Sequence, residues 1–241
     1  MSRWREIWNK RQADNKVLHD IDQNKIFMEL KRLDGYDILE NGISLESFEE
    51  KYEMTKKNLS HGIHSSINLS SVYEVGCGSG ANLFLFEKES IACGGADFSE
   101  SLIHVAKDVL HTDDLTCDEA VDIPREPHYD AVLSDGVFCY FPDERYAEEV
   151  LDIMLDKCTF SIGILDLFDT EKQEEYIAYR KKIIENYEER YKDLPRLFYS
   201  KSFFEEYAKK HGLDIYFPEY DMPGYWNNQF DFHCFMYKRS H

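Results

Sequence analysis

Long hydrophobic runs are absent from this sequence of 241 residues. The longest apolar runs, around residues 72–75 and 160–167, are far shorter than the roughly 20 residues that a membrane-spanning helix needs. The first residues, Met-Ser-Arg-Trp-Arg-Glu, contain no apolar core of a secretory signal. The sequence therefore predicts a cytoplasmic protein that does not act at a membrane.

Positive charge is scarce. The chain has 28 Lys and Arg residues against 47 Asp and Glu residues, which gives a formal net charge of −19. Its longest basic cluster is Arg180-Lys181-Lys182. A nucleic acid would meet a repulsive field instead of the basic surface that phosphate binding requires, so we expect no nucleic-acid partner.

Paired cysteines and metal-ligand motifs are missing as well. The six cysteines form no CxxC pair, which excludes a zinc ribbon and a disulfide framework. We expect them to be reduced and mostly buried. The sequence contains no HxxxH motif and no run of paired carboxylates, so we predict no metal site.

No repeat and no Pro/Gly/Ser-rich linker divides the chain. Apolar residues at helical spacing predict a helical N-terminal cap over residues 1–65. Residues 66–241 alternate strand and helix patterns, which predicts an α/β domain with a doubly wound, mostly parallel sheet. The strands are expected at residues 71–75, 91–96, 115–117, 129–134, 159–165, 213–217 and 230–237.

A helical insertion is predicted at residues 169–197. Within it, residues 171–191 read as one long helix with a row of tyrosines along one side. We interpret this row as packing against the core, with a direct role in substrate binding as the alternative. The N-terminal cap and this insertion should cover the carboxyl ends of the strands, where open α/β sheets bind ligands.

A glycine-rich turn follows the first predicted strand, in Val72-Tyr73-Glu74-Val75-Gly76-Cys77-Gly78-Ser79-Gly80. Glycines let the backbone pass close to a ligand, and the helix that follows offers free N–H groups. Gly76, Gly78 and Ala81 also fit a dinucleotide-binding turn. Glu74 separates the two readings, because its carboxylate would repel a diphosphate but suits a ligand with an ammonium and a sulfonium group. Glu74 as a hydrogen-bond anchor of the loop is the alternative.

These residues match the first motif of the class I S-adenosylmethionine-dependent methyltransferases, [D/E]-x-G-x-G-x-G. Asp97 and Phe98 follow the second strand, where the family carries the acid that binds the ribose hydroxyls. The segment from Glu119 and Ala120 to Pro124 resembles the family's adenine-contacting segment, with Glu119 where the family usually has Asp and the adjacent Asp118 as the alternative contacting acid. Residues 129–134, which end at Ser134, resemble its fourth-strand motif. The chain is thus similar to the small-molecule members of this family.

The resemblance implies a seven-stranded sheet of order 3-2-1-4-5-7-6 with an antiparallel last strand. It also implies S-adenosylmethionine as cofactor and S-adenosylhomocysteine as product. Trp8 and Arg11 resemble the W-x-x-R of small-molecule members, whose first helix folds over the methionine end of the cofactor. Arg11 would then bind the cofactor's carboxylate. The implied cofactor-binding residues are Trp8, Arg11, Glu74, Gly76, Cys77, Gly78, Gly80, Asp97, Phe98, Glu119, Ala120 and Ser134.

A catalytic base is harder to identify. Many relatives carry a histidine shortly after the fourth strand, where this chain has Tyr140. His233 lies within the last predicted strand, where a structural role is the alternative. We take Tyr140 and His233 as the catalytic candidates.

The expected activity is methyl transfer to an oxygen, nitrogen or carbon nucleophile of a small molecule, such as a sugar or a secondary metabolite. The enzyme is expected to be a monomer or a homodimer. An NAD(P)-dependent oxidoreductase and a non-catalytic methyltransferase-like binding protein are the alternatives.

Overall fold

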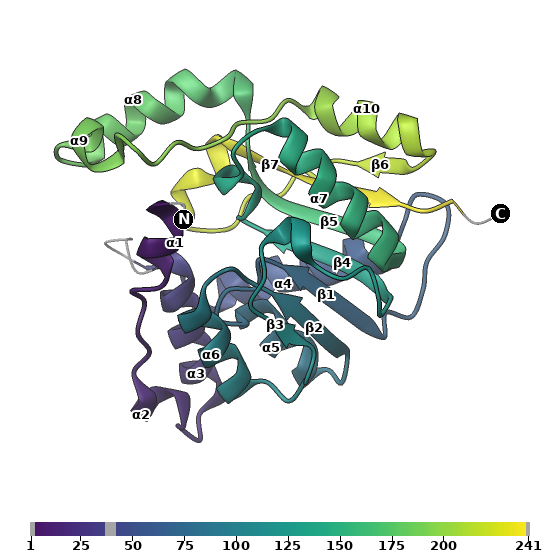
Figure 1. Cartoon of the computed structure of the whole chain (residues 1–241), viewed down its shortest axis with the longest axis horizontal. Coiled ribbons are helices and arrows are strands. Elements are labelled where there is room, and N and C mark those ends of the chain that lie inside the picture. The colour runs from purple at the N-terminus through teal and green to yellow at the C-terminus, as the bar shows by residue number, and fades with distance from the viewer. Residues whose placement is uncertain (1–2, 37–41, 240–241) are drawn as a thin grey trace.

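The computed structural model describes residues 3–36 and 42–239. Its centre is a seven-stranded sheet with the order β3-β2-β1-β4-β5-β7-β6 (Figure 1). The first five strands are parallel, and β7 is antiparallel to both of its neighbours. The predicted α/β class, strand order and antiparallel last strand are confirmed. The strands are β1 (Ser71–Val75), β2 (Ala92–Ala96), β3 (Leu115–Thr116), β4 (Tyr129–Asp135), β5 (Cys158–Phe168), β6 (Asp214–Tyr216) and β7 (Asp231–Tyr237).

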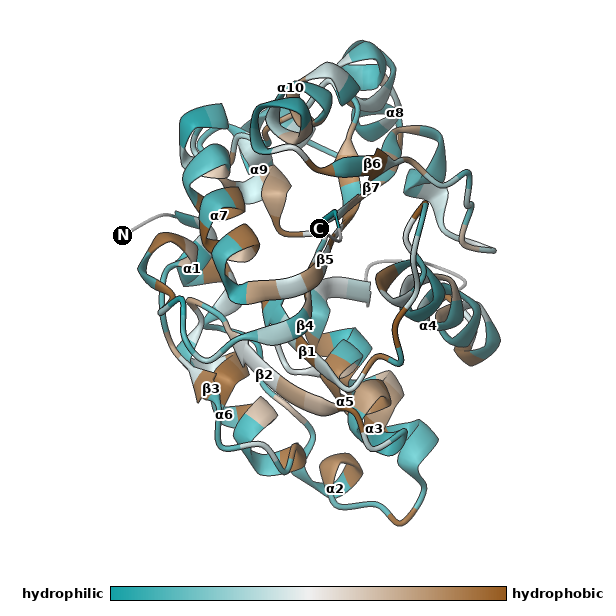
Figure 2. Ribbon diagram, turned by 90° about the vertical axis from the view of Figure 1, so that its right-hand side faces the viewer, coloured by the Kyte–Doolittle hydropathy of each residue, from teal (hydrophilic) through white to brown (hydrophobic). Residues whose placement is uncertain are grey.

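Helices cover both faces of the sheet, because successive side chains of the buried strands point to opposite faces. Val72 joins the apolar cluster on one face, and Tyr73 joins the cluster on the other. The first face packs against α4 (Leu45–Ser60), α5 (Ala81–Lys88) and α6 (Glu100–Val109). The second packs against α7 (Glu144–Lys157) and α10 (Lys201–His211). Figure 2 shows α4 and α7 on opposite sides of the sheet.

The N-terminal helices divide between two positions. They are α1 (Arg3–Trp8), α2 (Asn15–Leu18), α3 (Gln23–Lys31) and the π-helical turn η1 (Arg32–Tyr36), followed by α4. The first of them, α1, lies at the carboxyl end of the sheet (Figure 1), whereas α4 packs on its face. The Ser161 hydroxyl on β5 donates to the Leu59 carbonyl on α4 at 2.6 Å. The expectation that the whole prefix covers the strand ends is therefore wrong for α4, whose apolar side is buried by the sheet.

The tyrosine-rich segment is not one helix. It forms a 3-10 turn, η4 (Thr170–Lys172), then α8 (Gln173–Ile183), and, after a break, α9 (Tyr187–Tyr191). Asn186 at the break has a φ of 55°, a left-handed conformation that asparagine tolerates better than most residues. The prediction of a single helix over residues 171–191 is wrong for this reason. Figure 1 shows α8, α9 and α1 at the same end of the molecule.

Three further 3-10 turns lie in the connections: η2 (Ala120–Asp122), η3 (Phe138–Tyr140) and η5 (Trp226–Gln229). All six cysteines are free, and all except Cys117 are buried, as predicted. Across residues 3–36 and 42–239, no helix is both long enough and apolar enough to cross a membrane.

Candidate functional site

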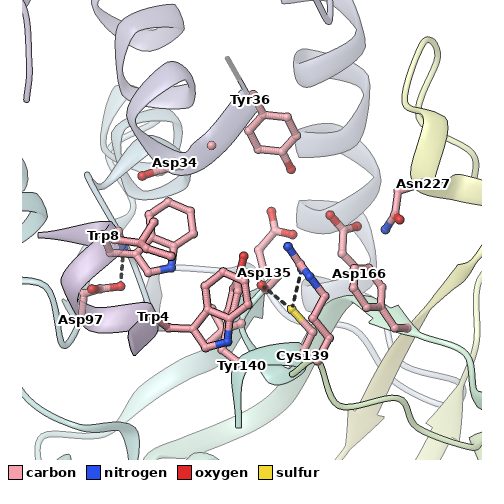
Figure 3. A pocket seen from close by; sticks show the side chains of 18 of the residues that line it. Trp4, Trp8, Asp34, Tyr36, Asp97, Asp135, Cys139, Tyr140, Asp166 and Asn227 are labelled. Atoms are coloured by element: carbon pink, nitrogen blue, oxygen red, sulfur yellow. Dashed lines mark hydrogen bonds between the residues drawn. The ribbon is translucent and has the colours of Figure 1, made fainter. Parts of the chain in front are cut away.

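A cavity of about 380 Å³ lies at the carboxyl ends of β1, β2, β4 and β5. Residues of α1, η1, α8 and α9 form its cover, together with Tyr225, Trp226 and Asn227 before β7. Figure 3 shows Asp135 in the middle of this pocket, with Asp34 and Asp97 to one side and Asp166 and Asn227 to the other. The position is the one at which parallel sheets bind ligands, and the volume is that of a small-molecule site.

The glycine turn after β1 forms one wall of the pocket, and its backbone N–H groups already have acceptors. Those of Gly76 and Cys77 donate to the Ala96 carbonyl at 2.7 and 3.0 Å, and that of Gly80 donates to the Cys77 carbonyl at 2.8 Å. The Gly78 and Ser79 N–H groups donate to the carboxylates of Asp97 and Asp34. The turn therefore has no N–H group left to offer to an anion.

The two carboxylates come from different parts of the chain. Asp97, after β2, accepts from Gly78 N at 3.0 Å and from Ser99 N at 2.7 Å. Asp34, on η1, accepts from Ser79 N at 2.8 Å. Burial raises the pKa of Asp97 to about 6 and that of Asp34 to about 7. Both side chains line the pocket, so this wall is acidic and accepts hydrogen bonds.

Gly78 must be a glycine for two reasons. Its φ is +54°, in the left-handed region that a β-carbon disfavours. A β-carbon there would also lie 2.5 Å from Oδ1 of Asp34, so the Asp34 carboxylate would have to move away from the turn.

Glu74 lies beside this wall with only 2% of its surface exposed. Its Oε1 accepts from the Asn82 amide at 2.7 Å, whereas its Oε2 has no hydrogen-bond donor within the described part of the chain. Burial raises the pKa of the Glu74 carboxyl well above its usual value. A ligand that brings a positively charged donor would both pair with Oε2 and favour the ionised form.

A buried ion cluster lies below the centre of the pocket. Nζ of Lys51, on α4, lies 2.8 Å from Asp135 and 3.0 Å from Asp166, and all three side chains are at most 7% exposed. Burial opposes ionisation of Asp135, but Lys51 and Lys31 outweigh it and lower its pKa to about 2. Burial likewise opposes the charge on Lys51, yet the two carboxylates raise its pKa above the usual value. The cluster holds the carboxylates of Asp135 and Asp166 at the pocket, and its cations keep Asp135 ionised.

Asp166 reaches the pocket through a distortion of β5. The pairing of β5 with β7 shifts register between Ile164 and Leu167, and Asp166 has a φ of 55°. Nδ1 of His233 accepts from the Asp166 N–H at 3.1 Å, so this ring nitrogen carries no proton. Burial lowers the pKa of His233, in agreement with a neutral ring. A bulge that aims a polar side chain into a pocket is a frequent feature of active sites.

Aromatic side chains form the floor around Tyr140 on η3. The rings of Trp4 and Trp8 meet the Tyr140 ring edge-on at 4.8 and 5.9 Å. Trp4 also donates from its indole N–H to the Pro195 carbonyl at 3.1 Å, which ties α1 to the segment after α9. Burial raises the pKa of Tyr140 above its usual value, so its hydroxyl is neutral.

The structure brings most of the predicted site residues together, although it does not test their roles. Those that line the pocket are Trp8, Arg11, Glu74, Gly76, Cys77, Gly78, Asp97, Phe98 and Tyr140. Those outside its lining are Gly80, Glu119, Ala120, Ser134 and His233.

The residues outside the lining have contacts of their own. Gly80 caps the N-terminus of α5, and Glu119 lies 2.7 Å from Arg5 of α1 in an ion pair. The buried Ser134 hydroxyl donates to the Val75 carbonyl at 3.0 Å. His233 supports the Asp166 backbone instead of facing a ligand, so the geometry favours the structural alternative for it.

Sequence reasoning missed several lining residues. Asp135 directly follows the predicted fourth strand, and Asp166 lies close to the end of the fifth, so the rule that ligands bind at carboxyl ends could have found both. Asp34 and Arg196 carry no local signal, because only tertiary packing brings η1 and the segment after α9 to the pocket. Within the residues that the structure describes, no group of three or more His, Cys, Asp and Glu side chains is placed to hold a metal ion.

Residues 73–158 match the family model of a methyltransferase domain. No curated protein matches the sequence. The chain is similar in structure to the plantazolicin methyltransferase BpumL in complex with SAH, with 20% identity, a TM-score of 0.56, and 81% of this chain and 82% of that chain covered. It is also similar to magnesium protoporphyrin IX methyltransferase (ChlM) from Synechocystis PCC 6803 with bound SAM, with 13% identity, a TM-score of 0.55, and coverage of 99% and 92%.

Proposed function

We propose that this chain, a class I methyltransferase by its matched domain and its fold, binds S-adenosylmethionine and methylates a small acceptor molecule. The cavity of about 380 Å³ and the formal charge of −19 support a small acceptor over a nucleic acid. We further propose a catalytic domain of residues 66–241 with the insertion at 169–197, preceded by a helical segment of residues 1–65 in which α1 and η1 cover the pocket and α4 packs on the sheet. We propose a monomer or a homodimer.

One observation carries the choice of cofactor. Every N–H group of the glycine turn from Gly76 to Gly80 already has an acceptor, and two of those acceptors are the carboxylates of Asp34 and Asp97. A dinucleotide turn instead needs free N–H groups and a positive field for its diphosphate. A nucleoside with ribose hydroxyls, an ammonium group and a sulfonium group offers donors and positive charge, which this wall accepts.

The residues present fit such a cofactor. Asp97 would accept the ribose hydroxyls, and Glu74 would take the ammonium group on its unpaired Oε2. Arg11 is proposed for the carboxylate, and the rings of Trp8 and Tyr140 would face the positive sulfur, as cations favour aromatic faces. When bound, the cofactor supplies a methyl group on a positively charged sulfur, open to in-line attack by a nucleophile.

The protein's part in the reaction is mainly alignment and exclusion of water. The elements α1, α8 and α9 cover part of the pocket and would limit the access of water, and the Asp166 carboxylate is held 3.0 Å from Nζ of Lys51. Asp166 is proposed to accept a hydrogen bond from the acceptor's nucleophile. The neutral hydroxyl of Tyr140 would orient the acceptor as a hydrogen-bond donor, which fits its raised pKa better than the role of a base.

Transfer of labelled methyl groups from S-adenosylmethionine to small molecules of a cell extract tests the proposal. We expect a labelled product with the wild-type protein and a strongly reduced amount with Asp97→Ala. Asp113→Ala, which removes an exposed acid between α6 and β3, is the matched control and should behave as wild type. Cofactor binding without any labelled product would instead support the non-catalytic alternative.

A further inference from the structure

Three arginines line the part of the pocket that α8 and α9 cover. They are Arg180 on α8, Arg190 on α9 and Arg196 in the segment that follows. In a chain with 47 acidic and 28 basic residues, carboxylates are the more abundant partner. Yet no ion pair joins any of these three guanidinium groups to an Asp or Glu within residues 3–36 and 42–239.

Arg180 is the most deeply buried of the three, with 6% of its surface exposed. Its guanidinium lies over the rings of Tyr176, Tyr187, Tyr191 and Trp226, with its carbon 5.0–5.9 Å from their centroids. Its Nε is buried and has no acceptor among the described residues. The rings stabilise the positive charge but do not satisfy the N–H donors, so the donors remain for a ligand.

Arg196 lies in a second group of rings. Its guanidinium carbon is 5.2 Å from the Trp4 ring centroid and 5.3 Å from those of Tyr140 and Phe168. In the described part of the chain an Nη of its side chain donates to the sulfur of Cys139 at 3.5 Å, and its guanidinium also interacts with the Tyr140 hydroxyl. Sulfur is a weak acceptor, so this guanidinium also retains donors for a ligand.

Four of the five carboxylates that line the pocket are engaged elsewhere, and the fifth, Glu74, is proposed above for the cofactor's ammonium group. Asp34 and Asp97 hold the glycine turn, and Asp135 and Asp166 share Lys51. Figure 3 shows Asp34 and Asp97 together on one side of the pocket, away from Asp166. The pocket therefore has an acidic wall that suits the cationic cofactor and, under α8 and α9, arginines that lack an anion.

We propose that the methyl acceptor is a small anion whose carboxylate or phosphate group binds to Arg180, Arg190 and Arg196. Guanidinium groups match both anions through paired N–H donors. The rings of Tyr176 and Trp226 would pack against the body of the acceptor. This inference rests on the proposed function, because it takes the cofactor to occupy the acidic wall, and it names the class of the acceptor.

Calorimetric titration with three small probes tests the proposal. Phenyl phosphate and benzoate carry the two anions on the same ring, and benzamide is their neutral counterpart. We expect phenyl phosphate, benzoate or both to bind the wild-type protein at least ten times more tightly than benzamide. The anion that binds more tightly indicates whether the acceptor carries a phosphate or a carboxylate. Equal binding of all three probes, or binding of none, would overturn the proposal.

Variants then assign the binding to the arginines. Arg196→Met and Arg190→Met should weaken binding of the preferred anion by tenfold or more and leave the affinity for S-adenosylhomocysteine unchanged. Arg190 is exposed, so its variant should fold, and Arg180→Lys is the conservative change at the buried position. Arg145→Met is the control, since Arg145 is an exposed residue of α7 whose side chain lies 3.3 Å from Glu149.

The titrations are made with and without S-adenosylhomocysteine, so that two failures can be told apart. Anion binding without any S-adenosylhomocysteine binding would contradict the proposed function but keep the anion site. If Arg196→Met and Arg190→Met weaken S-adenosylhomocysteine as much as the probe, these residues bind the cofactor's carboxylate and the inference is wrong. Unchanged probe affinity in both variants would also overturn it.

Discussion

Replacing Lys51 with methionine should destabilise the protein by about 3–5 kcal/mol, because the variant leaves buried carboxylates without their cation. In the wild-type protein Nζ of Lys51 lies 2.8 Å from Asp135 and 3.0 Å from Asp166, and the three side chains are 5%, 7% and 5% exposed. For a domain of this size the loss corresponds to a fall in Tm of roughly 6–20 °C. Methionine keeps the apolar stem of the side chain, so lost packing should add little.

Urea denaturation followed by tryptophan fluorescence measures this loss. Lys56→Met on the same helix is the control: Lys56 also contacts two carboxylates, Glu53 at 2.8 Å and Glu89 at 2.7 Å, but these are 62% and 41% exposed. Its loss should be about 1 kcal/mol or less. If Lys51→Met were as stable as Lys56→Met, Lys51 would not form a buried ion pair with an ionised Asp135.

The pH dependence gives the second half of this test. The folded-state pKa of Asp135, about 2, lies below its unfolded value of about 4, so the stability from its ion pairs is present above pH 4 and is lost as the pH falls toward 2. In Lys51→Met, burial is no longer opposed by Lys51 and should raise the pKa of Asp135, so the variant should gain stability as the pH is lowered from 7 to 5. The difference in free energy of unfolding between the wild-type protein and Lys51→Met should therefore become smaller toward pH 5. A stability difference that increases as the pH is lowered from 7 to 5 would refute this account of the ion cluster.

The remaining predictions concern single residues of the site. Gly78→Val should abolish binding of S-adenosylhomocysteine in calorimetry, because the new side chain would displace Asp34 from the turn; retained affinity would argue against this turn as the cofactor site. His233→Ala should lower the free energy of unfolding by about 1–3 kcal/mol by leaving the Asp166 N–H unpaired, with no change in the pH dependence of kcat. A lost acidic limb in that profile would restore His233 as a base. Tyr140→Phe should reduce kcat by less than about 100-fold, the minimum expected for loss of a general base; a larger loss in steady-state assays would contradict the orienting role.

The fold was predictable because its signals are local. The strand that runs into the glycine turn, and the alternation of strands and helices after it, lie in contiguous residues whose period and turn chemistry predict their structure. The long tyrosine-rich helix was mispredicted for a related reason. Its periodicity continues across Asn186, whereas the backbone there turns into a left-handed conformation that spacing does not reveal.

The same distinction between local sequence signals and tertiary packing applies to the residues of the site. Glu74, Gly78 and Asp97 belong to motifs within or directly after strands, and all three line the pocket. Asp34 and Arg196 come from segments far away in sequence, and only the packing of η1 and of the chain after α9 brings them to the cavity. The sequence predicts that the segments containing them cover the strand ends, but spacing does not reveal which of their side chains enter the cavity, so Asp34 and the arginines could not be singled out.

Binding of S-adenosylhomocysteine and of NAD⁺ to the same protein, measured by titration calorimetry, tests the central claim most directly. The carboxylates of Asp34 and Asp97 on the glycine turn predict that S-adenosylhomocysteine binds and that NAD⁺ does not. Asp97→Ala should weaken S-adenosylhomocysteine through loss of the ribose acceptor. Binding of NAD⁺ in competition with S-adenosylhomocysteine, or binding of NAD⁺ alone, would contradict the account.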